Sequence, residues 1–149
     1  MTAMSDHIEA IRRLIHRYAE LLDLGDLDGV AALFARSTWT AGGRDVVLRG
    51  AEHVRMAYNG VMLYDGIPCT KHQMTNVTID VGSDGKTATA RTYFTVLQAR
   101  PELPLQPIIA GRYHDEFACD AGGWYFTARE ILTDLVGDLS HHMAAAYRP

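Results

Sequence analysis

The sequence predicts an α+β fold in a single domain spanning residues 1–149. Its length and its composition, 48% hydrophobic and 21% charged, are typical of one globular domain with a substantial core. Residues 6–35 show the spacing of amphipathic helices, and residues 72–132 show mainly the period-two alternation of strands. Helices followed by consecutive strands favour an antiparallel sheet packed against those helices.

Two helices are expected at the start. Residues 6–22 place apolar side chains at i, i+3, i+4 and i+7 on one face, and Ser5 or Asp6 can cap the first turn. A glycine then interrupts the pattern. Asp26 is a suitable N-cap for a second helix over residues 27–35.

A hairpin and a third helix follow in the predicted order. Residues 38–40 and 46–48 are strand-like and flank residues 41–45, which contain two adjacent glycines. The third helix is expected over residues 51–58.

Four longer strands complete the predicted fold. They cover residues 72–81, 87–99, 108–119 and 124–132, and glycine-rich turns separate the first from the second and the third from the fourth. Three prolines in residues 101–107 predict a loop between the middle two strands.

Charge and local motifs exclude several functions. The net charge of −4 gives no electrostatic support for a nucleic acid or an anionic membrane as partner. No apolar run reaches the ~18 residues that span a bilayer, and the N-terminus lacks the features of a signal peptide. We therefore expect a cytoplasmic protein with Cys69 and Cys119 as reduced thiols. The sequence holds no phosphate-binding glycine loop and no serine-hydrolase elbow.

Asp23 and His72 are the first candidates for chemistry. Asp23 lies where the first helix ends, and His72 lies at the start of a strand. A helix end and a strand start can meet in one pocket, where the carboxylate would orient the imidazole as a proton acceptor. Each residue alone also suits a structural role, as a helix-end carboxylate or a strand histidine.

Asp115 is a charged residue that strand alternation places on the same strand face as Tyr113, which is unusual for a face expected to be buried. Tyr93 belongs to a different strand. Burying this carboxylate unpaired would be costly, so Arg91 or Arg129 is expected to pair with it. An internal ion pair and a pocket role both remain open.

Histidine clustering does not predict a metal site. His141 and His142 are adjacent, and His114 lies elsewhere, but no carboxylate or cysteine joins them at ligand spacing. We expect neither a metal nor a cofactor.

Several short segments, taken together, resemble the SnoaL-like branch of the NTF2-like superfamily, near the scytalone dehydratases and the hexachlorocyclohexane dehydrochlorinase. The resemblance covers residues 6–132. The segments that carry it are Arg17-Tyr18, Asp23-Leu-Gly-Asp26, Ala32-Leu-Phe34-Ala35, Thr70-Lys-His72, Gly111-Arg-Tyr113-His-Asp115-Glu-Phe117 and Gly123-Trp124-Tyr-Phe126.

The resemblance implies a cone, in which a curved antiparallel sheet wraps around the N-terminal helices and encloses an apolar cavity. In dehydratase-like members, the acid that matches Asp23 hydrogen-bonds the histidine that matches His72, and that histidine removes a proton next to a leaving group. Scytalone dehydratases have a tyrosine where this chain has Leu22, and a second histidine on the following strand, where this chain has none. Scytalone itself is therefore not the expected substrate.

The expected function is a small cofactor-free lyase of the dehydratase type, acting on an apolar cyclic or aromatic compound. His72 and Asp23 would be catalytic, and Tyr93, Tyr113, Trp39 and Asp115 would line the cavity. The alternatives are an isomerase or polyketide cyclase that uses the same base, a non-catalytic ligand-binding protein, and a β-subunit of a ring-hydroxylating dioxygenase. We also expect a homodimer, or a trimer, formed through the convex face of the sheet.

Overall fold

The structure is a computed structural model that describes residues 3–145. The helices within this range are α1 (Met4–Asp23), α2 (Leu27–Leu33), α3 (Gly50–Ala57) and the 3-10 turns η1 (Gly42–Arg44) and η2 (Tyr58–Gly60). The strands are β1 (Thr38–Ala41), β2 (Val46–Arg49), β3 (Thr70–Val81), β4 (Thr87–Arg100), β5 (Leu103–Asp120) and β6 (Gly123–Val136). The predicted α+β order is confirmed. Across residues 3–145, no helix has the length and apolar character needed to cross a bilayer.

One sheet joins all six strands in the order β2-β1-β6-β5-β4-β3. The four long strands form the expected antiparallel meander. β1, however, pairs in parallel with β6, so the sheet is mixed rather than purely antiparallel. Alternation along a strand reports which side chains are buried, not which strand becomes its neighbour, so the sequence could not predict this pairing.

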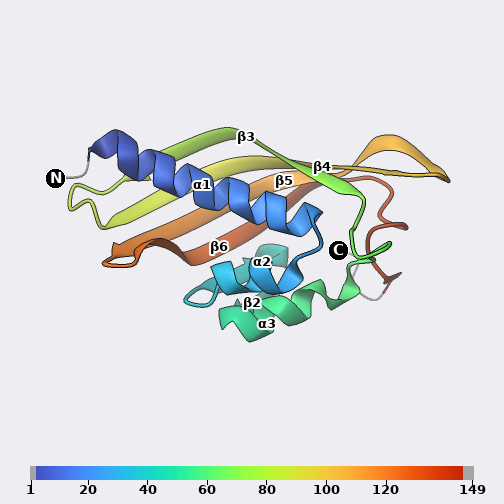
Figure 1. The fold of residues 1–149 in the computed structure, drawn as a ribbon, viewed down its shortest axis with the longest axis horizontal. Helices are drawn as coiled ribbons and strands as arrows, with labels where there is room; N and C mark the ends of the chain where they lie inside the picture. Colours follow the sequence, from blue (N-terminus) through green and yellow to red (C-terminus); the bar gives the residue numbers. More distant parts are fainter. Residues whose placement is uncertain (1–2, 146–149) are drawn as a thin grey trace.

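Helix α1 lies along one face of the long strands, and α2, β2 and α3 lie beside its C-terminal half (Figure 1). Its apolar face supplies Ile11, Ile15 and Tyr18 to the core, all at most 2% exposed. Asp26 caps α2 as predicted, because its side chain accepts a hydrogen bond from the Gly29 N–H. No helix of residues 3–145 covers the other face of the sheet (Figure 1).

The prolines do not form the predicted loop. β5 already begins at Leu103, and Arg100 pairs with Leu103 across a two-residue turn, so residues 101–107 lie mostly within the sheet. Pairing between β5 and β6 starts only at Ile109, which leaves residues 103–107 with β4 as their one strand neighbour. A strand edge tolerates proline because its missing N–H is not needed there.

Strand alternation is correct, but the face assigned to Tyr93 is not. On β4 the even-numbered residues from Ala88 to Gln98 are buried, and Tyr93 is 50% exposed on the opposite face. On β5 the odd-numbered residues from Gly111 to Phe117 are buried, Tyr113 and Asp115 among them. Alternation fixes which residues share a face, and only the placement of α1 decides which face is inside.

Candidate active site

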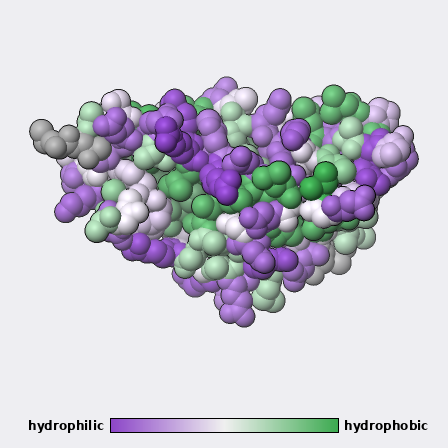
Figure 2. Space-filling model, viewed as in Figure 1, coloured by the Kyte–Doolittle hydropathy of each residue, from purple (hydrophilic) through white to green (hydrophobic). Residues whose placement is uncertain are grey.

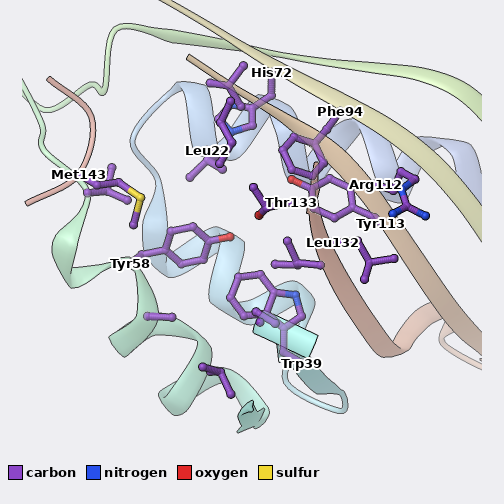
Figure 3. Close-up of a pocket in the computed structure, with 18 of the residues that line it drawn as sticks. Leu22, Trp39, Tyr58, His72, Phe94, Arg112, Tyr113, Leu132, Thr133 and Met143 are labelled. Atoms are coloured by element: carbon purple, nitrogen blue, oxygen red, sulfur yellow. The ribbon is translucent and has the colours of Figure 1, made fainter. Parts of the chain in front are cut away.

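A cavity of about 650 Å³ opens between α1, the long strands and the C-terminal segment. Its walls are mainly apolar and aromatic, with a few polar groups among them (Figure 3). The lining residues used below are Tyr18, Trp39, Tyr58, His72, Tyr113 and His142. Both the size and the lining are typical of a site for a small organic molecule.

Asp23 is the last residue of α1, a position where the helix dipole disfavours a carboxylate. Gly25 ends the helix in a left-handed conformation, φ 75°, and a side chain there would lie 2.0 Å from the carbonyl oxygen of Gly66. Glycine at this position therefore permits the helix end to lie close to the loop before β3. The carboxylate is thereby directed at the first residues of β3.

Three groups of β3 donate hydrogen bonds to Asp23. The Thr70 hydroxyl lies 2.9 Å from Oδ1, and the backbone N–H of His72 lies 2.8 Å from Oδ2. Nδ1 of the His72 ring lies 2.6 Å from Oδ1. The predicted meeting of Asp23 and His72 is therefore present in the structure.

The environment keeps Asp23 ionised. Burial by itself would raise the pKa of this carboxyl, but the hydrogen bonds and electrostatic attraction of His72, with the bond from Thr70, lower it below its ordinary value. An ionised carboxylate accepts the proton of Nδ1, so neutral His72 carries its lone pair on Nε2. Among residues 3–145, no group hydrogen-bonds Nε2, and His72 lines the cavity with a side chain only 4% exposed.

Three tyrosines form a polar group in the cavity wall. The Tyr18 hydroxyl lies 3.0 Å from that of Tyr58 and 3.4 Å from that of Tyr113. Burial raises the pKa values of Tyr58 and Tyr113 well above 10, so both hydroxyls stay protonated and can donate. Tyr113 and Trp39 were both expected to line the cavity, and both do so in the structure.

Asp115 does not line the cavity. Both of its oxygens accept hydrogen bonds from Arg129, at 2.7 and 2.8 Å, and neither side chain is exposed. The guanidinium also lies 4.2 Å from the ring centre of Tyr18 and 4.0 Å from that of Tyr113. Of the two possibilities left open by the sequence, the structure shows the internal ion pair.

Tyr93 also lies away from the cavity. It borders a separate hollow on the uncovered face of the sheet, together with Asn76 and Arg112. The expectation that Tyr93 lines the cavity is therefore wrong, for the reason of strand face given above. His141 contacts Glu102 at 3.4 Å whereas His142 faces the cavity, so these adjacent histidines do not share one site.

The sequence prediction missed Tyr18, Tyr58 and His142 as lining residues. Tyr18 lies on the buried face of α1, three residues after Ile15, and its place in that apolar pattern could have indicated that it faces inward. Tyr58 gave no signal beyond its place at the end of a predicted helix. His142 lies beyond the predicted strands, and only the return of the C-terminal segment brings it to the cavity.

Comparisons with known proteins identify the family and the fold of the chain. The sequence profile of the SnoaL-like domain matches residues 3–130. No curated protein matches the chain significantly.

Solved structures show the same fold at low sequence identity. An NTF2-like protein with a cystatin-like fold from Novosphingobium aromaticivorans has a TM-score of 0.74 at 23% identity, covering 93% of this chain and 88% of that one. A proposed scytalone dehydratase from the same species has a TM-score of 0.71 at 23% identity, covering 91% of each chain. A proposed dehydratase of the NTF2-like family from Streptomyces avermitilis has a TM-score of 0.71 at 16% identity, covering 90% of this chain and all of that one. Since the SnoaL-like profile covers most of the sequence and the architecture agrees, the protein belongs to the SnoaL-like family of the NTF2-like fold.

Proposed function

We propose that the protein is a cofactor-free lyase of the dehydratase type that acts on an apolar cyclic or aromatic compound. His72 is the base, and Asp23 positions it. The observation that carries this proposal is the difference between the two ring nitrogens of His72. Nδ1 is hydrogen-bonded to Asp23, and Nε2, beside the cavity, has no partner among residues 3–145.

The proposed step is an elimination. Nε2 of His72 takes a proton from a substrate carbon, and the C–H electron pair becomes the new C=C bond as the neighbouring C–O bond breaks. The departing hydroxide takes the proton back from the His72 imidazolium and leaves as water. Asp23 stabilises the imidazolium while it exists, and the dry cavity strengthens that attraction.

The cavity favours a ring compound over a charged metabolite. Arg112 and Asp134, which lie in its wall, are paired with each other at 2.8 Å, so neither charge is left for a substrate. The remaining walls are chiefly apolar and aromatic. An isomerase or cyclase would use the same dyad but return the proton to carbon, and product analysis would distinguish it.

Turnover by two variants tests the proposal. A thermal-shift screen of small aromatic and alicyclic compounds supplies the substrate, because a ligand that binds the folded state raises the melting temperature. His72→Ala should then lower kcat/KM by roughly 10²–10⁴-fold, and Asp23→Asn should also lower it by more than tenfold. Tyr93→Phe, on the opposite face of the sheet, is the matched control and should keep full activity.

Retention of activity within about threefold by both variants would show that neither residue serves as the base. A ligand that binds the wild type without turnover would instead favour a binding protein.

We further propose that the protein forms a homodimer or a trimer through the sheet face that carries Tyr93. This face is free of helices within the described chain, and Tyr93 is half-exposed on it. On the face that carries α1, apolar surface gathers toward the β4–β5 end of the sheet (Figure 2). Leu105 of β5 and Val136 of β6 are also exposed apolar side chains. Light scattering at tens of micromolar should give a multiple of 16.5 kDa, and a single species at the monomer mass would contradict the proposal.

A further inference from the structure

The cavity meets solvent between the tip of the β1–β2 hairpin and the end of β6. The exposed residues of its lining come from these two elements: Gly42, Gly43, Val46, Thr133 and Asp134. Tyr18, whose ring centre lies 6.5 Å from that of His72, is only 2% exposed. The dyad therefore lies at the buried end of the cavity, and the hairpin borders the mouth.

The C-terminal segment, which also forms part of the cavity wall, is fixed in place. The carbonyl oxygen of His141 accepts hydrogen bonds from the Tyr64 hydroxyl at 2.7 Å and from the Gln98 amide at 2.9 Å. The carbonyl oxygen of His142 accepts from the Met62 N–H at 2.8 Å. This part of the wall cannot move without breaking these bonds.

The β1–β2 hairpin is anchored at its base. The Arg49 side chain donates a hydrogen bond to the Thr38 hydroxyl at 3.2 Å. The Gly50 N–H donates to the carbonyl oxygen of Ser37 at 3.0 Å. The pairing of β1 with β6 ends at Thr40, and β2 lies at the edge of the sheet. Pairing with β6 therefore supports the base of the hairpin and not its tip, residues 41–46.

The hairpin tip has conformational freedom and space around it. Gly42 and Gly43 have φ angles of 60° and 67°, in a region that other residues rarely adopt. A Cβ atom placed on either glycine would have no atom within 4 Å. The hydrogen bond from the Asp45 N–H to the Gly42 carbonyl oxygen is 3.3 Å long, which exceeds the usual value of about 2.9–3.0 Å. The tip can therefore change its backbone conformation at little cost.

Val46 and Val47 are neighbours on β2 that face different surroundings. Each is 48% exposed. Val46 lies opposite Ala41 and lines the cavity with it. Val47 points to the other face of the strand and does not belong to the cavity lining. A ligand in the cavity would cover Val46 but not Val47.

We propose that the tip of the β1–β2 hairpin closes over an apolar ring bound in the cavity, and that Val46 then contacts the ring and seals the mouth. Proton removal by His72 needs a site from which water is excluded, and in this respect the inference rests on the proposed function. Covering the half-exposed Val46 side chain removes apolar surface from water, which favours the closed arrangement. Val46 is thus a substrate-contacting residue at the end of the cavity away from the dyad.

A neutral fluorescent probe tests the role of Val46. N-phenyl-1-naphthylamine, which brightens in apolar surroundings, is titrated into the full-length wild type, Val46→Ser and Val47→Ser. The affinity should fall about three- to tenfold in Val46→Ser, mainly through faster dissociation in stopped-flow measurements, because the methyl groups that cover the probe are lost. Val47→Ser is the matched control, with the same exposure on the other strand face, and its affinity should change less than about twofold.

Hydrogen exchange tests the closure of the hairpin. Saturating probe should slow the exchange of backbone amides in residues 42–46 and in the lining segment 57–61 by about fivefold or more, and should leave the β3–β4 turn, residues 82–86, unchanged. His72→Ala should abolish turnover yet keep the slowed exchange at the tip, so failure of the proposed function and failure of this inference give different results.

Four outcomes would overturn the inference. They are wild-type affinity in Val46→Ser, equal losses in the two valine variants, unchanged exchange of residues 42–46 with the probe bound, and a wild type that does not bind the probe.

Discussion

Two buried acid–base pairs lie in this fold, and they differ in what surrounds them. Asp115 and Arg129 are direct neighbours on adjacent strands, and both oxygens of Asp115 accept hydrogen bonds from Arg129. The remaining Nη1 of Arg129 is buried without a partner among residues 3–145 and has no open space beside it. Asp23 and His72 come from a helix end and a strand, 49 residues apart, and within the described chain Nε2 of His72 has no hydrogen-bond partner beside the cavity. A buried pair becomes a candidate for catalysis only where a functional atom is left over and faces open space.

The two regions also differ in whether their surroundings keep the side chains ionised. Burial by itself would lower the pKa of Arg129, but Asp115 raises it above its ordinary value, so the guanidinium stays charged. The cavity region instead holds neutral or exchangeable groups, including His142 with a pKa of about 4. The Arg129 guanidinium therefore keeps its charge, whereas the cavity region contains a histidine that can take up a proton as the pH falls.

The largest effect on stability is expected in the enclosed pair. Asp115→Asn leaves the Arg129 charge buried without its counter-ion and should lower the free energy of unfolding by about 3–5 kcal/mol. Urea denaturation measures this loss. The double variant Asp115→Leu with Arg129→Met should recover much of it, because neither charge then remains. A loss below about 1 kcal/mol in Asp115→Asn would contradict the contrast between the two pairs.

Acidification is expected to have the next largest effect on the free energy of unfolding, and this effect should arise from His142 in the cavity wall. The pKa of His142 is about 4 in the folded state against 6.5 for an ordinary histidine, so the unfolded chain binds the extra proton first. His142 therefore favours the folded state fully above pH 6.5, and the contribution of roughly 3 kcal/mol is lost as the pH falls toward 4. Stability curves of the wild type and His142→Phe, measured between pH 7 and 4, should converge or cross on acidification. Parallel curves would show that His142 does not titrate as described.

The smallest effect is expected from Asp23→Asn, because the amide oxygen still accepts one of the two bonds that Thr70 and the His72 backbone N–H donate to separate oxygens of Asp23. A loss of about 1–2 kcal/mol at neutral pH would follow from removing the charged acceptor. Since the folded pKa of Asp23 is below 3.8, its contribution is present above that pH and is lost as the pH falls through the lower folded value. Denaturation of wild type and variant below pH 3.8 should therefore show a shrinking difference. A stability loss as large as that of Asp115→Asn would remove the distinction between the pairs.

Local pattern was sufficient for the elements and for some of the site. The spacing of apolar residues predicted α1, and the capping role of Asp26 is confirmed. Alternation predicted the meander of four long strands and correctly placed Tyr113 and Asp115 on one face. The position of Asp23 at a helix end and of His72 at a strand start is a local property as well, but their meeting was expected mainly from the resemblance to the dehydratase-like proteins.

Tertiary structure decided the rest. The sequence by itself determined the α+β class, the element order and the residues available for chemistry, because these follow from short-range periodicity and residue type. Only the packed fold decided that Tyr93 faces outward, that Asp115 forms an internal ion pair with Arg129, and that His142 lines the cavity. Each of these depends on which elements become neighbours in space, and that is set by the burial of whole faces and by contacts between distant segments, neither of which is encoded in local spacing.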